Sequence, residues 1–160
     1  MIVIADTSPL NYLIRIGHVD VLPQLYGRIV IPPSVLMELK SKGAPEAVRQ
    51  WIEQPAAWLE IQAPQQTADL ALLEAKLGPG EQEAILLAEE VKADEVIIDE
   101  LRGRREATRR HIRVTGTIGV LRAAAKIGLI DLGNALERLG RTNFRIEKAL
   151  LDRIVRGDQM

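Results

Sequence analysis

The chain of 160 residues contains no cysteine, and this absence excludes several kinds of functional site. Disulfide bonds, thiolate zinc sites, iron–sulfur clusters and cysteine nucleophiles all require that side chain. Histidine is almost as scarce, since only His18 and His111 occur. A metal site with three histidine ligands is therefore impossible, and a site with two would need both.

Other absences narrow the class of protein. Aromatic residues are 3% of the chain, which argues against a platform on which single-stranded bases stack. No apolar stretch reaches the roughly 18 residues of a membrane span. The apolar N-terminus lacks the basic start of a signal peptide, and Asp6 interrupts it. Neither GxGxxG nor a P-loop pattern occurs, so no dinucleotide cofactor is expected. We expect a soluble, cytoplasmic protein without membrane contact.

Charge is divided unevenly along the chain, although the formal net charge is only −1. Residues 1–100 hold 7 basic and 16 acidic side chains, whereas residues 101–160 hold 14 basic and 6 acidic ones. This division fits a metal site beside a surface that binds a polyanion, and it also fits charges that pair across the fold. The hydrophobic content of 47% supports a substantial core in one domain.

Short, continuous apolar runs alternate with helical patterns, which predicts an α/β fold. Such runs are typical of strands buried on both faces of a parallel sheet of four to five strands. The predicted strands are residues 2–5, 28–31, 58–61, 95–98 and, as a short fifth, 112–114. The predicted helices begin at Ser8-Pro9, at Pro32-Pro33 and at Glu81, and others cover residues 117–127, 134–139 and 146–155.

Acidic residues stand where an α/β fold places its ligands, at the carboxyl ends of strands. Asp6 follows the first predicted strand, and Asp99 and Glu100 follow the fourth. Glu38 and Glu81 lie in predicted helices that can aim them at the same place. Clustered carboxylates repel each other unless a cation neutralises them. Mg²⁺ or Mn²⁺ accepts oxygen ligands and can activate water for phosphodiester cleavage, so these acids are candidate metal ligands and catalytic residues.

Each acid also has a structural explanation that its position leaves open. Asp6 can cap the helix at Ser8, and Asp99 can be a loop acid or cap the next helix. Glu38 can be an ordinary solvated helix residue, and Glu81 can stabilise a helix N-terminus through its negative charge. Glu83 lies about 200° around the helix from Glu81, so the two cannot face one ion equally.

The sequence resembles the PIN-domain family over about residues 1–130. Residues 6–10, with the sequence DTSPL, are similar to the opening of these proteins, as are residues 31–35 followed by Glu38. Residues 80–88 resemble the family's acidic helix start. Residues 97–100, 116–121 and 128–130 are similar to a prokaryotic PIN subgroup that is related to VapC-like toxins.

The resemblance implies one PIN-like domain over residues 1–160, with a core over 1–130 and C-terminal helices over 131–160. It implies a metal-dependent endoribonuclease that is the toxin of a toxin–antitoxin pair, with RNA as substrate, a cognate antitoxin protein and often a homodimer. The positions that match the family's ligands for Mg²⁺ or Mn²⁺ are Asp6, Glu38, Glu81 and Asp99. Glu100 is a substitute for Asp99, because this strand end departs from the family's usual Thr-x-Asp pattern.

Six arginines crowd into residues 102–113, directly after Asp99. Arg102, Arg105 and Arg109 share one helical face, where their guanidinium groups can hold RNA phosphates. An ion-paired, solvated face explains the same spacing. The resemblance also implies that Ser8 forms hydrogen bonds near the ion and the substrate.

A catalytically inactive PIN fold that binds RNA or a protein is the alternative function, and the unusual Asp99-Glu100 sequence favours it. Receiver domains and haloacid-dehalogenase-like phosphatases are disfavoured, because the residues after Asp6 supply no second acid.

Overall fold

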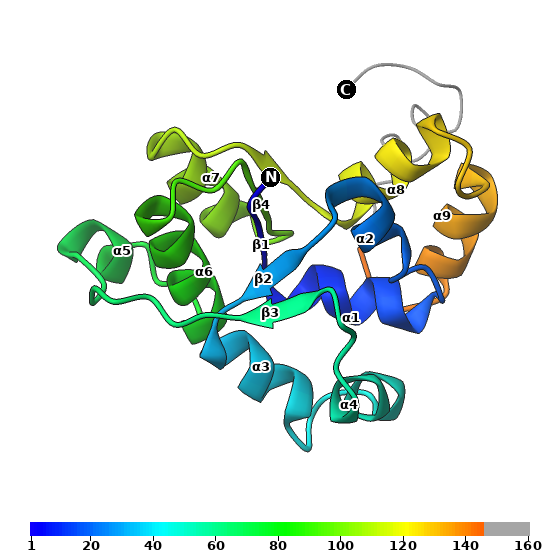
Figure 1. Cartoon of the computed structure of the whole chain (residues 1–160), viewed down its shortest axis with the longest axis horizontal. Coiled ribbons are helices and arrows are strands. Elements are labelled where there is room, and N and C mark those ends of the chain that lie inside the picture. The colour runs from blue at the N-terminus through cyan, green and yellow to red at the C-terminus, as the bar shows by residue number, and fades with distance from the viewer. Residues whose placement is uncertain (146–160) are drawn as a thin grey trace.

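A computed structural model describes residues 1–145, in which strands and helices alternate as the sequence predicts (Figure 1). The strands are β1 (Val3–Ala5), β2 (Ile29–Ile31), β3 (Leu59–Ile61), β4 (Glu95–Ile97) and β5 (Val114–Thr115). The helices are α1 (Thr7–Arg15), α2 (Val21–Tyr26), α3 (Pro33–Lys40), α4 (Glu46–Glu53), α5 (Leu70–Glu74), α6 (Pro79–Glu90), α7 (Leu101–Arg109), α8 (Thr117–Lys126) and α9 (Leu132–Gly140). No helix among these residues has the length and apolarity to cross a membrane.

The strands form one parallel sheet in the order β3-β2-β1-β4-β5. The chain builds outward from β1 through β2 to β3 and then crosses back, so that β4 lies on the other side of β1. The pairing of β1 with β4 places Ala5 beside Ile97. The predicted class, an α/β fold with four to five parallel strands, is confirmed.

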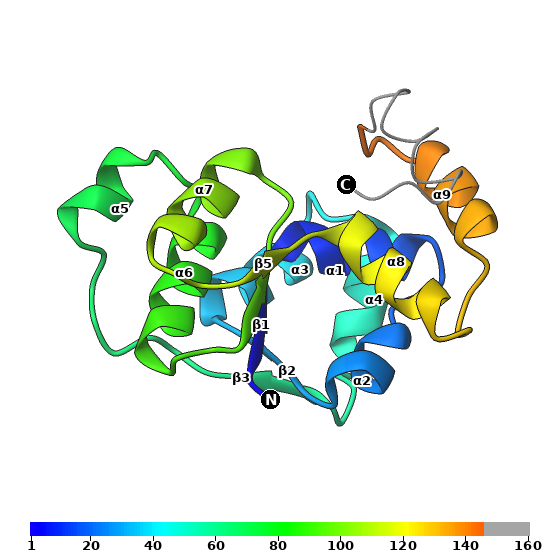
Figure 2. The same cartoon turned by 90° about the horizontal axis from the view of Figure 1, so that it is seen from above.

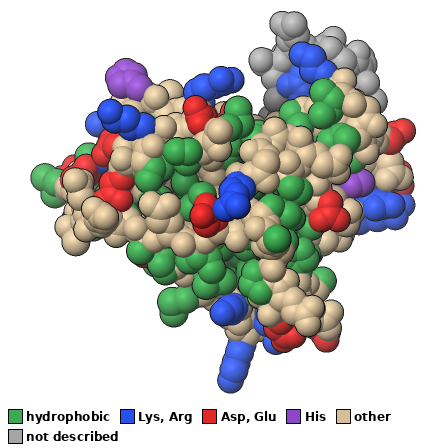
Figure 3. Space-filling model, viewed as in Figure 1, with side chains coloured by type: hydrophobic (Ala, Val, Ile, Leu, Met, Phe, Trp, Pro, Cys, Tyr) green, Lys and Arg blue, Asp and Glu red, His purple; other side chains and the backbone are tan. Residues whose placement is uncertain are grey.

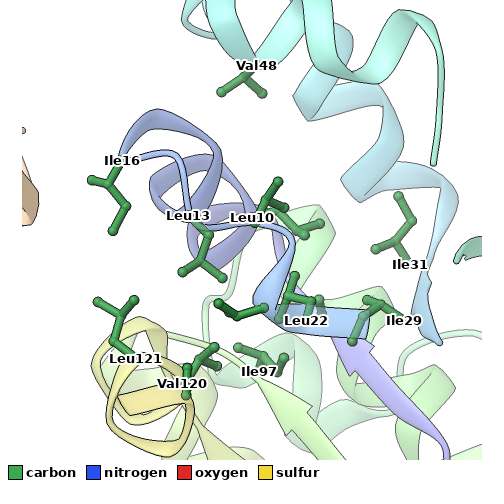
Figure 4. Packing of buried hydrophobic residues seen from close by; sticks show 14 of the residues in the cluster. Leu10, Leu13, Ile16, Leu22, Ile29, Ile31, Val48, Ile97, Val120 and Leu121 are labelled. Carbon is green, nitrogen blue, oxygen red and sulfur yellow. The ribbon is translucent and has the colours of Figure 1, made fainter. Parts of the chain in front are cut away.

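Helices cover both faces of the sheet, and successive strand residues point into two different hydrophobic cores. Ile4 and Val96 face the core that contains residues of α5, α6 and α7. Ile97 faces the other core, where it joins Leu10 of α1 and Val120 of α8 (Figure 4). In Figures 1 and 2, α5, α6 and α7 accordingly lie to one side of the sheet and α1, α2, α8 and α9 to the other. Burial of strands from both faces explains their continuous apolarity.

The start of α1 differs from the prediction in a way that concerns the site. The sequence predicts a helix that begins at Ser8-Pro9, whereas α1 begins at Thr7 and Asp6 occupies the N-cap position. Pro9 is tolerated because backbone N–H groups in a first helical turn have no partner within the helix. The Asp6 side chain forms no capping hydrogen bond, so its carboxylate does not stabilise the helix end in that way.

Other predicted elements agree with the structure apart from their ends and three short helices. The fifth strand is Val114–Thr115 instead of 112–114, and α6 begins at Pro79 instead of at Glu81. The sequence analysis did not identify α2, α4 and α5, each of eight residues or fewer. The predicted helix over residues 146–155 lies outside the described residues. The division between a core over 1–130 and C-terminal helices over 131–160 stays a prediction.

The acidic and basic parts of the chain meet in a partly buried ion-pair network. Arg110 of α7 lies 2.7 Å from Asp69, 3.1 Å from Glu89 and 3.6 Å from Glu106. Glu106 is only 3% exposed. On the face shown in Figure 3, acidic and basic side chains are interspersed and form no single block. Part of the charge asymmetry along the sequence is therefore resolved by pairing across the fold.

Candidate metal centre

An acidic pocket of about 680 Å³ opens at the carboxyl ends of β1 and β4, where the strand order reverses. Asp6 follows β1, and Asp99 and Glu100 follow β4, while Glu38 comes from α3 and Glu81 from the first turn of α6. All five predicted acids therefore meet at one pocket. Among the described residues, its lining is Asp6, Thr7, Ser8, Asn11, Tyr12, Glu38, Glu81, Asp99, Glu100, Leu101, Asn143, Phe144 and Arg145.

Asp6 and Glu38 converge over the start of α6. Asp6 is 5% exposed. Thr7 donates a hydrogen bond from Oγ1 to Glu38 Oε2 at 2.7 Å. A Cβ atom at Gly80 would lie within 3.2 Å of both Asp6 Oδ1 and Glu38 Oε2. Only a glycine at this position leaves room for both carboxylates.

Glu81 and Glu83 point to different neighbours, as their angular separation on the helix predicts. Glu81 Oε1 accepts a hydrogen bond from the backbone N–H of Gly78 at 3.3 Å, and its buried Oε2 has no hydrogen-bond partner among residues 1–145. Glu83 instead accepts hydrogen bonds from the backbone N–H of Ser34 at 2.9 Å and from its hydroxyl at 2.7 Å. Glu83 thereby ties α6 to the start of α3, the helix that carries Glu38.

Asp99 is held by three hydrogen bonds at the edge of the pocket. The backbone N–H of Thr117 donates to Oδ1 at 2.7 Å, and the Thr117 hydroxyl donates to Oδ2 at 2.7 Å. Ser8 Oγ donates to Oδ2 at 2.9 Å. Asp99 therefore caps α8, and not α7, the next helix along the chain, and it also lines the pocket. The adjacent Glu100 lines the pocket from the N-cap position of α7.

Burial and mutual repulsion raise the pKa of two carboxyl groups. The pKa of Asp6 rises from 3.8 to about 8, mainly because burial removes the carboxylate from water. A hydrogen bond from the Thr7 backbone opposes this rise, and repulsion by Glu81, Glu38 and Asp99 adds to it. The pKa of Glu81 is also raised, mainly by burial and further by neighbouring carboxylates. A bound proton or cation therefore stabilises the pocket.

The donor set fits a hard divalent cation that keeps part of its water shell. Mg²⁺ is usually bound through one or two carboxylates together with several water molecules. Asp6 and Glu38 provide two converging carboxylates, and Glu81 lines the same pocket. The Oε2 atom of Glu81, which has no hydrogen-bond partner among residues 1–145, lies toward Gly103 of α7. Within residues 1–145, no three acidic or histidine side chains form a group close enough to hold an ion by themselves. Water would complete the coordination of such an ion.

The predicted basic face of α7 lies away from the acidic pocket. Arg102, Arg105 and Arg109 do not line it, and they are exposed on α7, whose buried residues are Gly103, Glu106 and Ala107. Arg109 instead pairs with Glu106 at 3.3 Å. The geometry therefore does not support the expectation that these arginines flank the acids. Their contact with RNA stays a prediction.

Part of the pocket wall was missed from the sequence. The Tyr12 hydroxyl donates to Asn143 Oδ1 at 3.0 Å, and its ring meets that of Phe144 edge to face with centroids 4.9 Å apart. Tyr12 stands four residues after Ser8, on the same side of α1, and this spacing was a usable signal. No local pattern marks residues 143–145, which reach the pocket only through the tertiary fold.

Comparisons with known proteins agree with this architecture. Among solved structures, the fold is similar to that of a PilT N-terminus domain protein from the hyperthermophilic archaeon Sulfolobus solfataricus P2, with a TM-score of 0.52 and 12% identity. The similarity covers 92% of this chain and 100% of that chain. No curated protein matches. A family model described as a PIN domain (DUF3368) matches residues 2–159, and PIN domains generally have a nuclease-type fold that uses a divalent metal. The chain therefore belongs to the PIN-domain family, as its sequence motifs indicated.

Proposed function

We propose that this PIN domain is a metal-dependent endoribonuclease that acts as the toxin of a toxin–antitoxin pair. One observation carries the proposal: four acids from separate parts of the fold meet in one pocket at the switch point of the sheet, namely Asp6, Glu38, Glu81 and Asp99. The raised pKa of Asp6 means that its ionised form destabilises the folded chain near neutral pH. A site for a cation explains that placement better than a structural role does.

In this proposal Mg²⁺ or Mn²⁺ is held by Asp6, Glu38, Glu81 and Asp99, with Glu100 as the substitute for Asp99. Such an ion, when bound, lowers the pKa of a water molecule and stabilises the oxygen that leaves during phosphodiester hydrolysis. The neutral hydroxyls of the site orient the carboxylates without cancelling their charge. Thr7 holds Glu38, and Ser8 and Thr117 hold Asp99.

The toxin assignment extends the resemblance to VapC-like proteins and includes cytoplasmic RNA as the substrate. Five acidic side chains and one basic side chain, Arg145, line the pocket. A cognate antitoxin is expected to block it with a positively charged segment, because complementary charge guides such contacts. A short upstream gene for a DNA-binding protein would support this pairing. The homodimer that the resemblance implies is part of this proposal, and residues 146–160, whose apolar side chains can serve a dimer interface or the core, lie outside the described residues.

Replacing Asp6 with asparagine tests the nuclease assignment. We expect Asp6→Asn to fold normally and to lose Mn²⁺-dependent RNA cleavage, because the amide keeps the shape of the side chain and removes its charge. Asp20→Asn is the matched control, since Asp20 is an exposed aspartate that precedes α2 and makes no capping hydrogen bond. Undiminished cleavage by Asp6→Asn would remove Asp6 from the metal ligands.

A PIN fold that binds RNA or a protein without cleavage is the second candidate. Both oxygens of Asp99 already accept hydrogen bonds, and residues 1–145 contain no preassembled group of three ligands. Calorimetry with Mn²⁺ separates the candidates. Binding that disappears in Asp6→Asn supports the nuclease, whereas no binding at millimolar Mn²⁺ supports the binding module.

A further inference from the structure

A second cavity, of about 320 Å³, adjoins the acidic pocket and differs from it in charge. The two share the side chains of Asp99, Leu101, Phe144 and Arg145. Beyond this border the second cavity is lined by Arg104 of α7 and by residues of β5 and the start of α8. Among residues 1–145, the charged side chains that line it are Arg104, Arg145 and, at the border, Asp99. The acidic pocket therefore continues into a basic groove.

Arg104 is fixed in this groove by the backbone and not by an acid. Its Nη1 donates a hydrogen bond to the carbonyl oxygen of Ile98 at 3.2 Å, just beyond β4. A Cβ atom at Gly116 would lie 2.7 Å from Arg104 Nη1 and 2.8 Å from Asp99 Oδ1, so a glycine admits the guanidinium beside Asp99. Among residues 1–145, no carboxylate oxygen lies within 4 Å of a side-chain nitrogen of Arg104. Its charge is available to a ligand.

The other arginines of this region are placed differently. Arg109 and Arg110 pair with carboxylates. Arg102 and Arg105 are exposed and line neither cavity. At about 100° per residue, Arg104 lies about 200° around α7 from Arg102. Arg104 is therefore the arginine of α7 that faces the groove.

Arg145 reaches the groove because the segment after α9 is anchored on α1. Asn143 Oδ1 accepts hydrogen bonds from the Tyr12 hydroxyl at 3.0 Å and from Arg15 at 2.8 Å. The ring of Phe144 packs against that of Tyr12. These contacts present Arg145 at the border that the two cavities share.

We propose that this groove binds the RNA phosphate next to the one that is cleaved, with Arg104 as its main contact and Arg145 at its rim. The inference rests on the proposed function. A strand that places one phosphate in the acidic pocket must pass the Asp99 carboxylate, which repels the neighbouring phosphate. A guanidinium directly beyond Asp99 offsets this repulsion, and its planar fork suits two phosphate oxygens. Leu101, Val114 and Ile118 supply apolar lining, and Thr115 adds a polar residue to the charged side chains of the groove.

Binding of fluorescein-labelled hexauridylate, measured by anisotropy in EDTA so that no metal-dependent cleavage occurs, tests the proposal. Arg104→Gln is compared with Arg28→Gln, which removes the same charge from an exposed arginine directly before β2, at the opposite end of the sheet from the pocket. We expect Arg104→Gln to weaken binding about tenfold at 0.1 M salt, as for loss of one charged hydrogen-bond contact. The slope of log K against log salt should fall by about 0.7, the value for one phosphate contact of a single strand. Arg28→Gln should change the affinity less than about twofold.

Equal losses in the two variants, an unchanged Arg104→Gln or no binding by the unaltered chain would each overturn the proposal. Because Arg104 also contacts Ile98, unfolding temperatures are measured as well. If Arg104→Gln does not fold, the exposed Arg145 is used for the test. Arg145→Gln must then show a smaller slope of log K against log salt than the unaltered chain. If Arg104→Gln weakens RNA binding but the unaltered chain does not cleave RNA with Mn²⁺, the nuclease assignment is contradicted and the groove is not. If the unaltered chain cleaves RNA but Arg104→Gln binds RNA normally, the groove is contradicted and the nuclease assignment is not.

Discussion

Replacing Gly80 with alanine tests whether the convergence of Asp6 and Glu38 matters for activity. The added Cβ would overlap Glu38 Oε2 and lie 3.2 Å from Asp6 Oδ1. Since non-bonded heavy atoms rest about 3.5 Å apart, the Glu38 carboxylate must move by about 1 Å. A misplacement of about 1 Å can slow a catalysed reaction about 100-fold. We expect a loss of that order in Mn²⁺-dependent RNA cleavage.

The fold should tolerate this substitution. Gly80 is the second residue of α6, where alanine is favoured over glycine by up to about 1 kcal/mol, and the atom that must move ends a flexible side chain. Gly140→Ala is the control, because an added Cβ at the last residue of α9 meets no atom within 4 Å. Thermal unfolding and RNA cleavage are measured for both variants. Full cleavage by a normally folded Gly80→Ala variant would refute the reasoning.

Three further predictions concern the residues that charge or orient the pocket. The pKa of Asp6 is about 8 in the folded chain, against an ordinary value of 3.8. As the pH rises, the Asp6 carboxyl group therefore loses its proton first in the unfolded chain. The free energy of unfolding should fall as the pH rises from about 4 to 8, because the protonated carboxyl then no longer favours the folded chain. Mn²⁺ must displace that proton, so calorimetry should show its Kd falling by up to about tenfold per pH unit below pH 8. The control Asp20→Asn should keep this dependence, and a Kd that does not change with pH would contradict the linkage. Glu83→Ala should lower the free energy of unfolding in urea by about 1–3 kcal/mol, because a charged acceptor of two hydrogen bonds is lost, whereas the exposed Glu74→Ala should have little effect. Thr117→Val keeps the side-chain shape but removes a hydroxyl donor from Asp99, so we expect about 1 kcal/mol less stability and slower cleavage, and equal rates would contradict an orienting role.

The fold class follows from the sequence because burial on both faces of a sheet leaves a direct mark on composition. Residues 2–5 and 95–98 are apolar almost throughout, and they form or adjoin the central strands β1 and β4. Short helices such as α2 and α5 were missed, since five or six residues contain less than two turns of periodic pattern. The family resemblance strengthened the prediction through the order and spacing of several motifs.

The acidic site was predictable because parallel topology brings the ends of distant strands together. Asp6 and Asp99 follow adjacent strands in the sheet, so their proximity follows from strand order alone. The basic groove was not predictable in this way. The spacing of Arg102, Arg105 and Arg109 identifies a shared helical face, but spacing does not say which face meets the rest of the fold. Arg104 was not predicted as an RNA contact because it does not lie on that face. It is nevertheless the arginine of α7 that lines the groove.

Two buried acids in this chain show how a structural carboxylate differs from one placed for a cation. Glu106 is 3% exposed, and the fold surrounds it with Arg109 and Arg110 at 3.3 and 3.6 Å. Asp6 is 5% exposed, yet among residues 1–145 no arginine, lysine or histidine pairs with it within 4 Å, and its pKa rises to about 8. A sequence selected only for stability would neutralise Asp6 as it neutralises Glu106, because an uncompensated buried charge is costly. In the proposed function, the negative charge gathered around Asp6 is left for a ligand, and the carboxylate oxygens of the pocket are the donors that a hard divalent ion prefers.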